Sequence, residues 1–515
     1  MTKLVLLHHL IPLTVLVLVV ATHRSAFSFS VHSLIPSSSR SRTSSSLCLS
    51  SHSPKHLLVV GGGIAGLSSA YDARHLLNPN DRITLLSDRP TFQFTPSNPW
   101  VAIGSRSERD ISVDLREVLP RHGVDFVPGR AVKLFPQENR VELQSGDALT
   151  YDYLMIATGP RLAFEEVPGL DPHITGSSVC TTSHAVDAKE KIDRLVTNPG
   201  PIVVGAAEGA SCFGPAYEFA LLLHSELKKR GGTKLVDACP MTFVTAEPYI
   251  GHLGLGGAGE SRIILEDLLK ERSIDFHTNC RVTSVAKDSI SIEVVKEEES
   301  NTTTTTTTQH ILPSKLTMII PPFRGHDVWK STPDLTDKNG LIVVNEYQQS
   351  PLYPRIFSAG VCVSIPPVER TLVATGPPKT GYMIESQGTA AIKNIRQMMD
   401  YYDSHPEEGQ DPLATSPELS SKPLLNGLCI TDFGDDGAVF LTLPQYHPRK
   451  KDVTLHGRLA TLAKVAFEKY FLFKVENGDT DPYYERYMLH LIGVDRVKVA
   501  ERERKEIEDG RNIVP

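Results

Sequence analysis

The chain has 515 residues, of which 40% are hydrophobic and 22% are charged, with 53 Lys and Arg against 60 Asp and Glu. This balance is typical of a folded protein of about two to four domains and excludes a collagen-like or wholly disordered chain. The formal net charge of -7 argues against a nucleic-acid partner, because nucleic-acid-binding domains are usually basic. The cysteines include no CxxC pair, so no zinc or other metal site is predicted.

Residues 1–53 carry the features of a targeting presequence. An apolar run from Leu10 to Ala21 follows Lys3 and is too short to span a membrane. The stretch 25–53 is rich in Ser and Arg and contains no acidic residue, and its start resembles the cleavage site of bipartite presequences for secondary plastids. We predict a disordered presequence that directs the chain to an organellar membrane. A plastid is favoured, the mitochondrial inner membrane is the alternative location, and an uncleaved anchor is the other interpretation of the segment.

The first structured unit is a strand, a glycine-rich turn and a helix. Residues 56–60 are apolar and lead into Gly61-x-Gly63-x-x-Gly66, which contains Ile64 and Ala65, and a second strand follows at 83–86. In such a βαβ unit the glycines permit a tight turn, close approach of a pyrophosphate, and packing of helix on strand. The turn therefore predicts a dinucleotide site.

Two further features surround this predicted site. The acidic residue that normally ends the second strand is missing, and Ser87 followed by Asp88 stands there instead. After a predicted β-meander over 123–156, Thr158 and Gly159 form a small-residue turn where backbone passes close to a ligand. Together with Gly360, which Val361 follows in place of the usual Asp, these features resemble the flavoproteins with two dinucleotide-binding domains. The resemblance implies that the first unit holds FAD.

A second strand–turn–helix unit begins at 201–205 but lacks a complete fingerprint. Its third glycine position is Ala210, and Glu208 would repel a pyrophosphate. A nicotinamide cofactor is therefore not expected there. Further along, residues 294–312 contain seven consecutive threonines, which we interpret as a solvated loop insertion.

The C-terminal part differs from the rest of the chain in composition and in the spacing of its apolar residues. A Ser/Pro/Glu-rich stretch over 401–423 is predicted to be a linker. Residues 458–474 and 482–493 place Leu, Phe, Tyr and Ala at helical spacing among Lys and Arg. Two such amphipathic helices are typical of a segment that lies on a membrane surface.

Seven stretches of the chain resemble sulfide:quinone oxidoreductases, a family of flavoproteins. The resemblance extends from about residue 55 to residue 495, with interruptions at the threonine insertion and the linker. The stretches that carry it are FQFTPSNPWVAIG (92–104), YDYLMIATGP (151–160), VCTTSHA (179–185), GASCFGPAYE (209–218), EPYIGHLG (247–254), PPKTGYMIES (377–386) and VAFEKYF (465–471).

The resemblance implies roles for particular residues. Cys212 and Cys429 would form the redox pair that accepts sulfide, and Cys180 would be a third functional cysteine. His184, His252 or Glu218 would take a proton, and Lys379 would lie near the isoalloxazine. Phe467 and Tyr484 would line a quinone pocket. Whether Cys180 bonds covalently to FAD stays open, as do the quinone type and the sulfur acceptor.

The predicted fold is α/β, with two Rossmann-type domains and a C-terminal membrane-facing segment of amphipathic helices. The predicted domains are an FAD-binding one over 54–165 and 320–400, a second Rossmann-type one over 166–319, and a redox-cysteine and quinone segment over 424–515. The predicted function is FAD-dependent oxidation of sulfide through a cysteine persulfide, with electrons passed to a membrane quinone. A homo-oligomer is compatible with the sequence. The alternatives are a type II NAD(P)H:quinone oxidoreductase, a flavin–cysteine redox sensor without turnover, and a flavocytochrome-type subunit.

Overall fold

The structure is a computed structural model that describes residues 53–297, 305–408, 417–479 and 497–498. The predicted presequence, Tyr484 and the predicted helix over 482–493 lie outside the described residues. The described part is an α/β protein with two parallel sheets, which confirms the predicted fold class.

The first sheet is parallel and has the strand order β19-β9-β1-β2-β5. Its strands are β1 (His56–Val60), β2 (Arg82–Ser87), β5 (Asp125–Pro128), β9 (Tyr153–Ile156) and β19 (Ile356–Ser358). Most are short apolar runs, as a sheet covered on both faces requires. Because β19 pairs with β9 although it is far away in the chain, the sheet combines strands from 54–165 and from 320–400.

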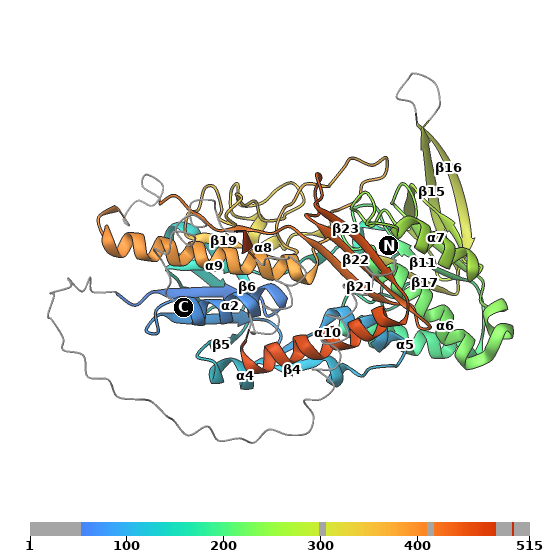
Figure 1. Cartoon of the computed structure of the whole chain (residues 1–515), viewed down its shortest axis with the longest axis horizontal. Helices are drawn as coiled ribbons and strands as arrows, with labels where there is room; N and C mark the ends of the chain where they lie inside the picture. Colours follow the sequence, from blue (N-terminus) through green and yellow to red (C-terminus); the bar gives the residue numbers. More distant parts are fainter. Residues whose placement is uncertain (1–52, 298–304, 409–416, 480–496, 499–515) are drawn as a thin grey trace, which may run out of the picture.

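Helices cover one face of this sheet and a small antiparallel sheet covers the other. Helix α2 (Ile64–Leu76) packs along α9 (Gly381–Ser404), as Figure 1 shows. On the opposite face lie β6 (Ala131–Phe135), β7 (Arg140–Leu143) and β8 (Ala148–Thr150). The prediction that residues 124–127 begin this meander is wrong. They form β5, which pairs in parallel with β2, because α4 (Leu115–Arg121) returns the chain to the edge of the first sheet.

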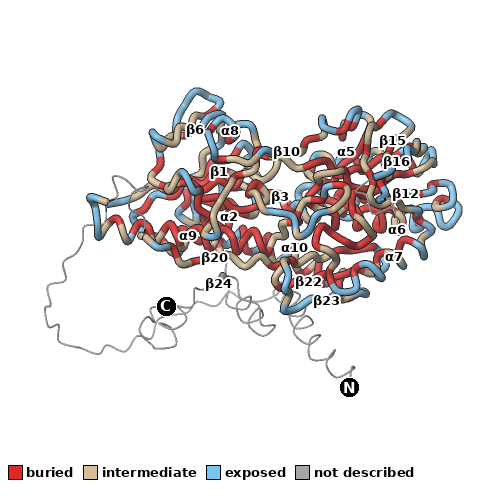
Figure 2. Tube along the Cα trace, turned by 90° about the horizontal axis from the view of Figure 1, so that it is seen from above, coloured by how far each residue is buried: buried red, intermediate tan, exposed pale blue. Residues whose placement is uncertain are grey.

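The second sheet has the order β13-β12-β11-β17 and is also parallel. Its strands are β11 (Ile202–Ala206), β12 (Met241–Thr245), β13 (Asp275–His277) and β17 (Leu316–Ile320). The helices that follow or flank them are α5 (Thr182–Thr197), α6 (Gly214–Asp237) and α7 (Ser261–Glu271). Figure 2 shows the two sheets as buried centres of two lobes.

The threonine-rich stretch is not a loop over most of its length. Strands β15 (Ser289–Glu297) and β16 (Thr305–Pro313) pair as a long antiparallel hairpin, with β14 (Cys280–Val285) beside β15. Threonine is β-branched, so a run of threonines suits an extended strand. The side chains of 305–309 are exposed, so the stretch is solvated as predicted, and Figure 1 shows the hairpin projecting from the body.

A third unit follows the predicted linker and touches both lobes. Strands β21 (Gly427–Asp432), β22 (Gly437–Leu443) and β23 (Lys451–His456) form an antiparallel sheet, and α10 (Arg458–Asn477) follows. Strand β21 packs against α6 of the second lobe and α9 of the first. This position brings the third unit to the junction between the lobes (Figure 2).

The predicted linker is structured at both described ends. Helix α9 continues to Ser404, and residues 417–423 lie along it. Asn394 exchanges two hydrogen bonds with the backbone of Ser421 (2.8 and 3.0 Å), and Gln397 donates to the Glu418 carbonyl (2.7 Å). These hydrogen bonds satisfy backbone groups that water would have to solvate in a free linker.

The remaining short elements connect these layers. They are β3 (Thr91–Gln93), α3 (Asn98–Ala102), β4 (Ser112–Asp114), β10 (Arg161–Leu162), β18 (Phe323–Arg324), α8 (Asp327–Lys330), β20 (Lys422–Pro423), β24 (Val497–Lys498) and four single 3-10 turns.

Candidate active site

In the glycine-rich turn after β1, Gly61 and Gly66 pack closely against backbone, whereas Gly63 faces open space. Gly61 has φ +118°, and a Cβ there would lie 2.3 Å from the Ala157 carbonyl oxygen. A Cβ on Gly66 would lie 1.8 Å from the carbonyl oxygen of Gly61. By contrast, nothing stands within 4 Å of a Cβ built on Gly63, which begins α2.

A dinucleotide phosphate fits this turn. The first turn of α2 contains Ile64 and Ala65 and carries no acidic residue, so its free backbone N–H groups and helix dipole face open space at Gly63. Gly159 has φ +69° and is also free of neighbours within 4 Å of a built Cβ. The residues predicted to bind FAD therefore leave room where its pyrophosphate would lie.

The other predicted FAD residues lie around the same turn. Thr158 Oγ1 accepts a hydrogen bond from the Trp329 indole (3.1 Å). Gly360 has φ +93°, and its N–H donates to Gln387 Oε1 (3.0 Å). Ser87 is buried against the turn, whereas Asp88 is exposed and lies beside Arg89. Of the two candidates for the ribose, Ser87 is thus the one that faces the turn.

Lys379 lies two residues before α9 and close to the turn at Gly360. Its Nζ donates to the Val361 carbonyl oxygen (3.2 Å), one residue after Gly360. Burial lowers the pKa of Lys379 to about 8. Whether Lys379 lies beside the isoalloxazine stays a prediction; a charged lysine there would stabilise a reduced flavin.

The corresponding turn of the second lobe is closed by the chain itself. Gly209 N–H donates to the Ala374 carbonyl oxygen, and Gly376 N–H donates to the Ala210 carbonyl oxygen, both at 2.8 Å. Glu208 forms an ion pair with Arg281 (2.9 Å). The backbone groups that would bind a nicotinamide dinucleotide are therefore already bonded, which agrees with the missing fingerprint.

The three predicted cysteines come together from distant parts of the chain. Cys212 directly precedes α6, Cys429 lies on β21, and Cys180 precedes α5. A Cβ on Gly214 would lie 3.0 Å from Cys429 Sγ, so this sulfur touches the turn that carries Cys212. Burial raises the pKa of the Cys212 thiol, and the nearby Cys429, Cys180 and Glu218 raise it further.

The environment of these thiols keeps them protonated at neutral pH. Burial raises the pKa of Cys180 to about 11 and that of Cys429 to about 12. A thiolate is the form that reacts with sulfur, so a base beside the thiols is required. Glu218 is that candidate, because its charge acts on both Cys212 and Cys429.

Glu218 is a buried carboxylate held by a buried lysine. Its side chain forms an ion pair with Lys464 on α10, and its Oε1 accepts a hydrogen bond from Asp432 N–H (3.3 Å). Burial raises the pKa of Glu218, with Lys464 acting in the opposite direction. The raised pKa moves the carboxyl toward the range in which it can accept a proton and later release it.

The two predicted histidines lie in other surroundings. His184 packs between Phe164 and His173, and burial lowers its pKa to about 4. His252 is buried and bonded at both nitrogens: Nδ1 accepts from Gly254 N–H (3.1 Å), so Nε2 donates to Glu369 (2.7 Å). Among the described residues, neither histidine is one of the charges that shift the pKa of the three cysteines.

Three residues of this site were missed by the sequence reasoning: Lys464, Asp432 and Trp100. Lys464 stands on the apolar stripe of a predicted helix, and a lysine in such a stripe is a signal for a buried charge pair. Asp432 follows Cys429 by three residues, and Trp100 lies within the stretch 92–104 already singled out by the family resemblance.

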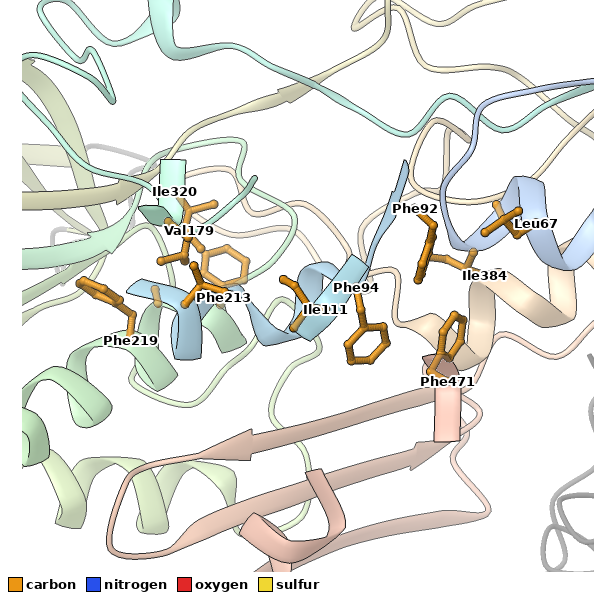
Figure 3. Packing of buried hydrophobic residues seen from close by; sticks show 14 of the residues in the cluster. Leu67, Phe92, Phe94, Ile111, Val179, Phe213, Phe219, Ile320, Ile384 and Phe471 are labelled. Atoms are coloured by element: carbon orange, nitrogen blue, oxygen red, sulfur yellow. The ribbon is translucent and has the colours of Figure 1, made fainter. Parts of the chain in front are cut away.

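Phe467 belongs to an aromatic cluster at the junction of the lobes. Its ring lies 5.6 Å from that of Phe94 and 6.1 Å from that of Phe471, and Phe92 stacks on Phe471. Figure 3 labels Phe92, Phe94 and Phe471, which lie near one another. A Cβ on Gly381, the first residue of α9, would lie 4.0 Å from the Phe467 ring. The cluster therefore borders the N-terminal end of α9.

Helix α10 buries charged residues together with part of its predicted apolar stripe. Lys464, Glu468 and Lys474 are buried in ion pairs with Glu218, Arg106 and Glu385. Leu459, Leu462 and Phe473 are 45%, 47% and 51% exposed. Of the predicted apolar stripe, Ala463, Ala466 and Phe471 are buried while Phe467 and Tyr470 are half-buried. The three buried charges are held by ion pairs with residues of other elements, and the three exposed apolar side chains lie on the surface of α10.

Within the described ranges, no helix is both long and apolar enough to cross a membrane.

Comparisons with known proteins agree with this geometry. Residues 55–388 match the family model of pyridine nucleotide-disulphide oxidoreductases. The sulfide-quinone reductase of Aquifex aeolicus (strain VF5) is 43% identical over 439 residues, covering 85% of this chain and 95% of that protein. The mitochondrial sulfide:quinone oxidoreductase of Mus musculus is 25% identical over 459 residues, covering 86% and 91%.

A solved structure gives the same result. The X-ray structure of the sulfide:quinone oxidoreductase from Aquifex aeolicus superposes with a TM-score of 0.77 at 40% identity, covering 87% of this chain and 97% of that one. The family implied by the sequence resemblance is confirmed, and the NAD(P)H-dependent alternative is not favoured. The chain belongs to the sulfide:quinone oxidoreductases, a family of FAD-dependent enzymes among the pyridine nucleotide-disulphide oxidoreductases.

Proposed function

We propose that this enzyme oxidises sulfide at Cys212 and Cys429 and passes two electrons through FAD to a membrane quinone. The observation that carries the proposal is the meeting of these cysteines beside one buried carboxylate, Glu218, although one comes from the second lobe and the other from the third unit. The residues around Gly61–Gly66 and Lys379 would hold FAD, which supplies the two-electron acceptor when bound.

The sulfur chemistry balances on the two cysteines. Hydrosulfide attacks a sulfur–sulfur bridge between them, and one cysteine becomes a persulfide while the other leaves as a thiolate. When the terminal sulfur of the persulfide bonds to that thiolate, the bridge is restored with one more sulfur. This bond formation releases two electrons and one proton. The electrons pass to the flavin, and Glu218 takes the proton.

Cys180 and the histidines have supporting roles in this proposal. Cys180 lies close enough to raise the pKa of Cys212, which supports a place for it in handling the growing sulfur chain. His252, fixed by Glu369, would orient the loop beside Phe213, since a Cβ on Gly254 would lie 3.1 Å from that ring. His184, which lies near the start of α5, would be a further proton acceptor. Phe467 and Tyr484 would bind the quinone ring.

The test is an anaerobic titration of the flavin-loaded enzyme followed by absorbance. We expect sulfide to bleach the flavin band, a short-chain quinone to restore it, and NADH to have no effect. Bleaching by NADH would indicate that the enzyme is an NAD(P)H:quinone oxidoreductase instead. Bleaching by sulfide without reoxidation by quinone would favour a redox sensor that has no turnover.

The exposed face of α10 supports docking on a membrane surface. We expect the double variant Leu462→Glu/Phe473→Glu to reduce partitioning onto lipid vesicles by about 100-fold, because each apolar side chain contributes roughly 1.5–3 kcal/mol when buried. Vesicle cosedimentation measures this. Ile263→Glu on α7 is the control, since Ile263 is 62% exposed on the second lobe. Equal binding by all three proteins would contradict the assignment of this face.

An organellar membrane is the proposed location. Support comes from the presequence composition and from the mouse relative, which is named as mitochondrial. That relative favours the mitochondrion, so the plastid interpretation of residues 1–53 lacks support from the comparisons.

A further inference from the structure

Beside the two cysteines, four residues from four elements contact one another in a closed ring. Glu218 on α6 pairs with Lys464 on α10, and the Lys464 ammonium lies over the Trp100 ring, 5.0 Å from its centroid. Trp100 on α3 donates its indole N–H to Asp432 Oδ2 (2.7 Å). The backbone N–H of Asp432 on β21 returns to Glu218 Oε1 (3.3 Å). All four side chains are buried.

This ring contains two carboxylates and one lysine. Both carboxylates are buried, and the charge of Asp432 acts on Glu218, so either could attract the Lys464 ammonium. The structure pairs the lysine with Glu218. Asp432 is satisfied instead by other donors, namely the Trp100 indole, the Thr461 hydroxyl (3.1 Å) and Gly434 N–H (3.1 Å).

We propose that Trp100 is a positioning residue for the sulfide step: its indole N–H satisfies Asp432 and thereby reserves the Lys464 ammonium for Glu218 beside the cysteines. This inference rests on the proposed function of the site. It goes beyond it because Trp100 touches neither cysteine and does no chemistry itself. The position is well suited to the task, since one indole bonds to the strand that carries Cys429 and also covers the lysine that pairs with the base.

The other charged groups around this ring are already engaged. Arg106 lies over the Trp100 ring at 4.6 Å and pairs with Glu468, so a cation stands against the ring in addition to Lys464. Arg272 acts on Asp432 and pairs with Asp436. Among the described residues, Cys212 and Cys429 are titratable groups on which the charge of Glu218 acts. The Lys464 ammonium and the Asp432 backbone N–H both bond to Glu218 Oε1, and Lys464 also lies over the Trp100 ring, so Lys464 is placed to respond when the indole N–H is removed.

The variant Trp100→Phe tests this directly because it keeps an aromatic ring and removes only the N–H and part of the ring. Without the indole, Asp432 competes for Lys464, and Glu218 loses part of the positive charge that stabilises its ionised form. The pKa of Glu218 then rises, so a step that needs the ionised carboxylate moves to higher pH. We expect the pH midpoint of flavin reduction by sulfide to rise by about one unit, and the rate at neutral pH to fall about tenfold.

A second substitution separates this effect from simple loss of packing. In Trp100→Phe/Asp432→Asn the ring is equally truncated, but residue 432 carries no charge to compete for the lysine. We expect the double variant to lose the upward shift of the pH midpoint. Asp432→Asn alone should lower the midpoint, because the charge of Asp432 raises the pKa of Glu218. Flavin-loaded wild type and the three variants are mixed anaerobically with sulfide, and flavin bleaching is followed across the neutral pH range. Titration of sulfide itself affects all four proteins equally.

The outcomes are distinct. A Trp100→Phe enzyme with the wild-type midpoint would overturn the proposal, and so would a double variant whose midpoint is still raised, because the effect would then come from packing. Failure of sulfide to reduce the wild-type flavin would refute the proposed function and this inference with it. The expected result is a pH midpoint that rises in Trp100→Phe and no longer rises in the double variant.

Discussion

Replacing Cys212 by serine is expected to lower the rate of flavin reduction by sulfide about 10³-fold or more, because a hydroxyl can neither form nor break the sulfur bonds of the reaction. The structure supports this strongly, since Cys212 lies in the turn that Cys429 Sγ touches and beside Glu218. Stopped-flow bleaching of the flavin under anaerobic conditions measures the effect. The same variant should still be reoxidised by quinone after photochemical reduction, because the quinone side of the flavin does not depend on this thiol.

A matched control is available within the same chain. Cys239 is buried at the end of α6, away from the glycine turns, and packs in the main apolar core. Cys239→Ser should change thermal stability more than it changes sulfide oxidation, whereas Cys212→Ser should do the reverse. If Cys212→Ser kept sulfide-dependent bleaching, the cysteine chemistry proposed here would have to be abandoned.

Gly63→Val is expected to leave the apoprotein intact and to weaken FAD binding by about 100-fold, a loss of roughly 3 kcal/mol. The backbone at Gly63 is extended, with φ -89°, and nothing lies within 4 Å of a built Cβ, so the protein alone has no reason to resist a side chain. Only a ligand phosphate at the start of α2 would meet the new methyl groups. Melting of the apoprotein and fluorescence titration with FAD measure the two effects separately.

Gly66→Ala is the contrasting variant. Its Cβ would lie 1.8 Å from the Gly61 carbonyl oxygen, so the backbone itself must move. This substitution should lower the melting temperature of the apoprotein as well as FAD binding. Equal FAD affinity for Gly63→Val and wild type would show that the pyrophosphate does not approach Gly63, and the FAD assignment of this turn would need revision.

The glycine turns could be read from the sequence because their requirement is local. Gly61 needs a positive φ and Gly66 needs the absence of a side chain, and both needs arise within a few residues of chain. The parallel strands were recognisable for a similar reason, since a short apolar run bounded by turns is a local pattern. The threonine run was misjudged because its hairpin depends on a partner strand, β15, that local composition does not reveal.

The two lobes and the cofactor turn followed from residue types and their spacing, because backbone conformation is a property of short segments. The candidate cysteines were implied by the family resemblance. The approach of Cys429 to Cys212, the choice of Glu218 as partner of Lys464, and the burial of charged residues on α10 depended on the packed molecule. Each of them involves charges or atoms from elements far apart in the chain. A buried lysine pairs with whichever carboxylate the other donors leave available, and that competition exists only once helix, strand and turn have packed together.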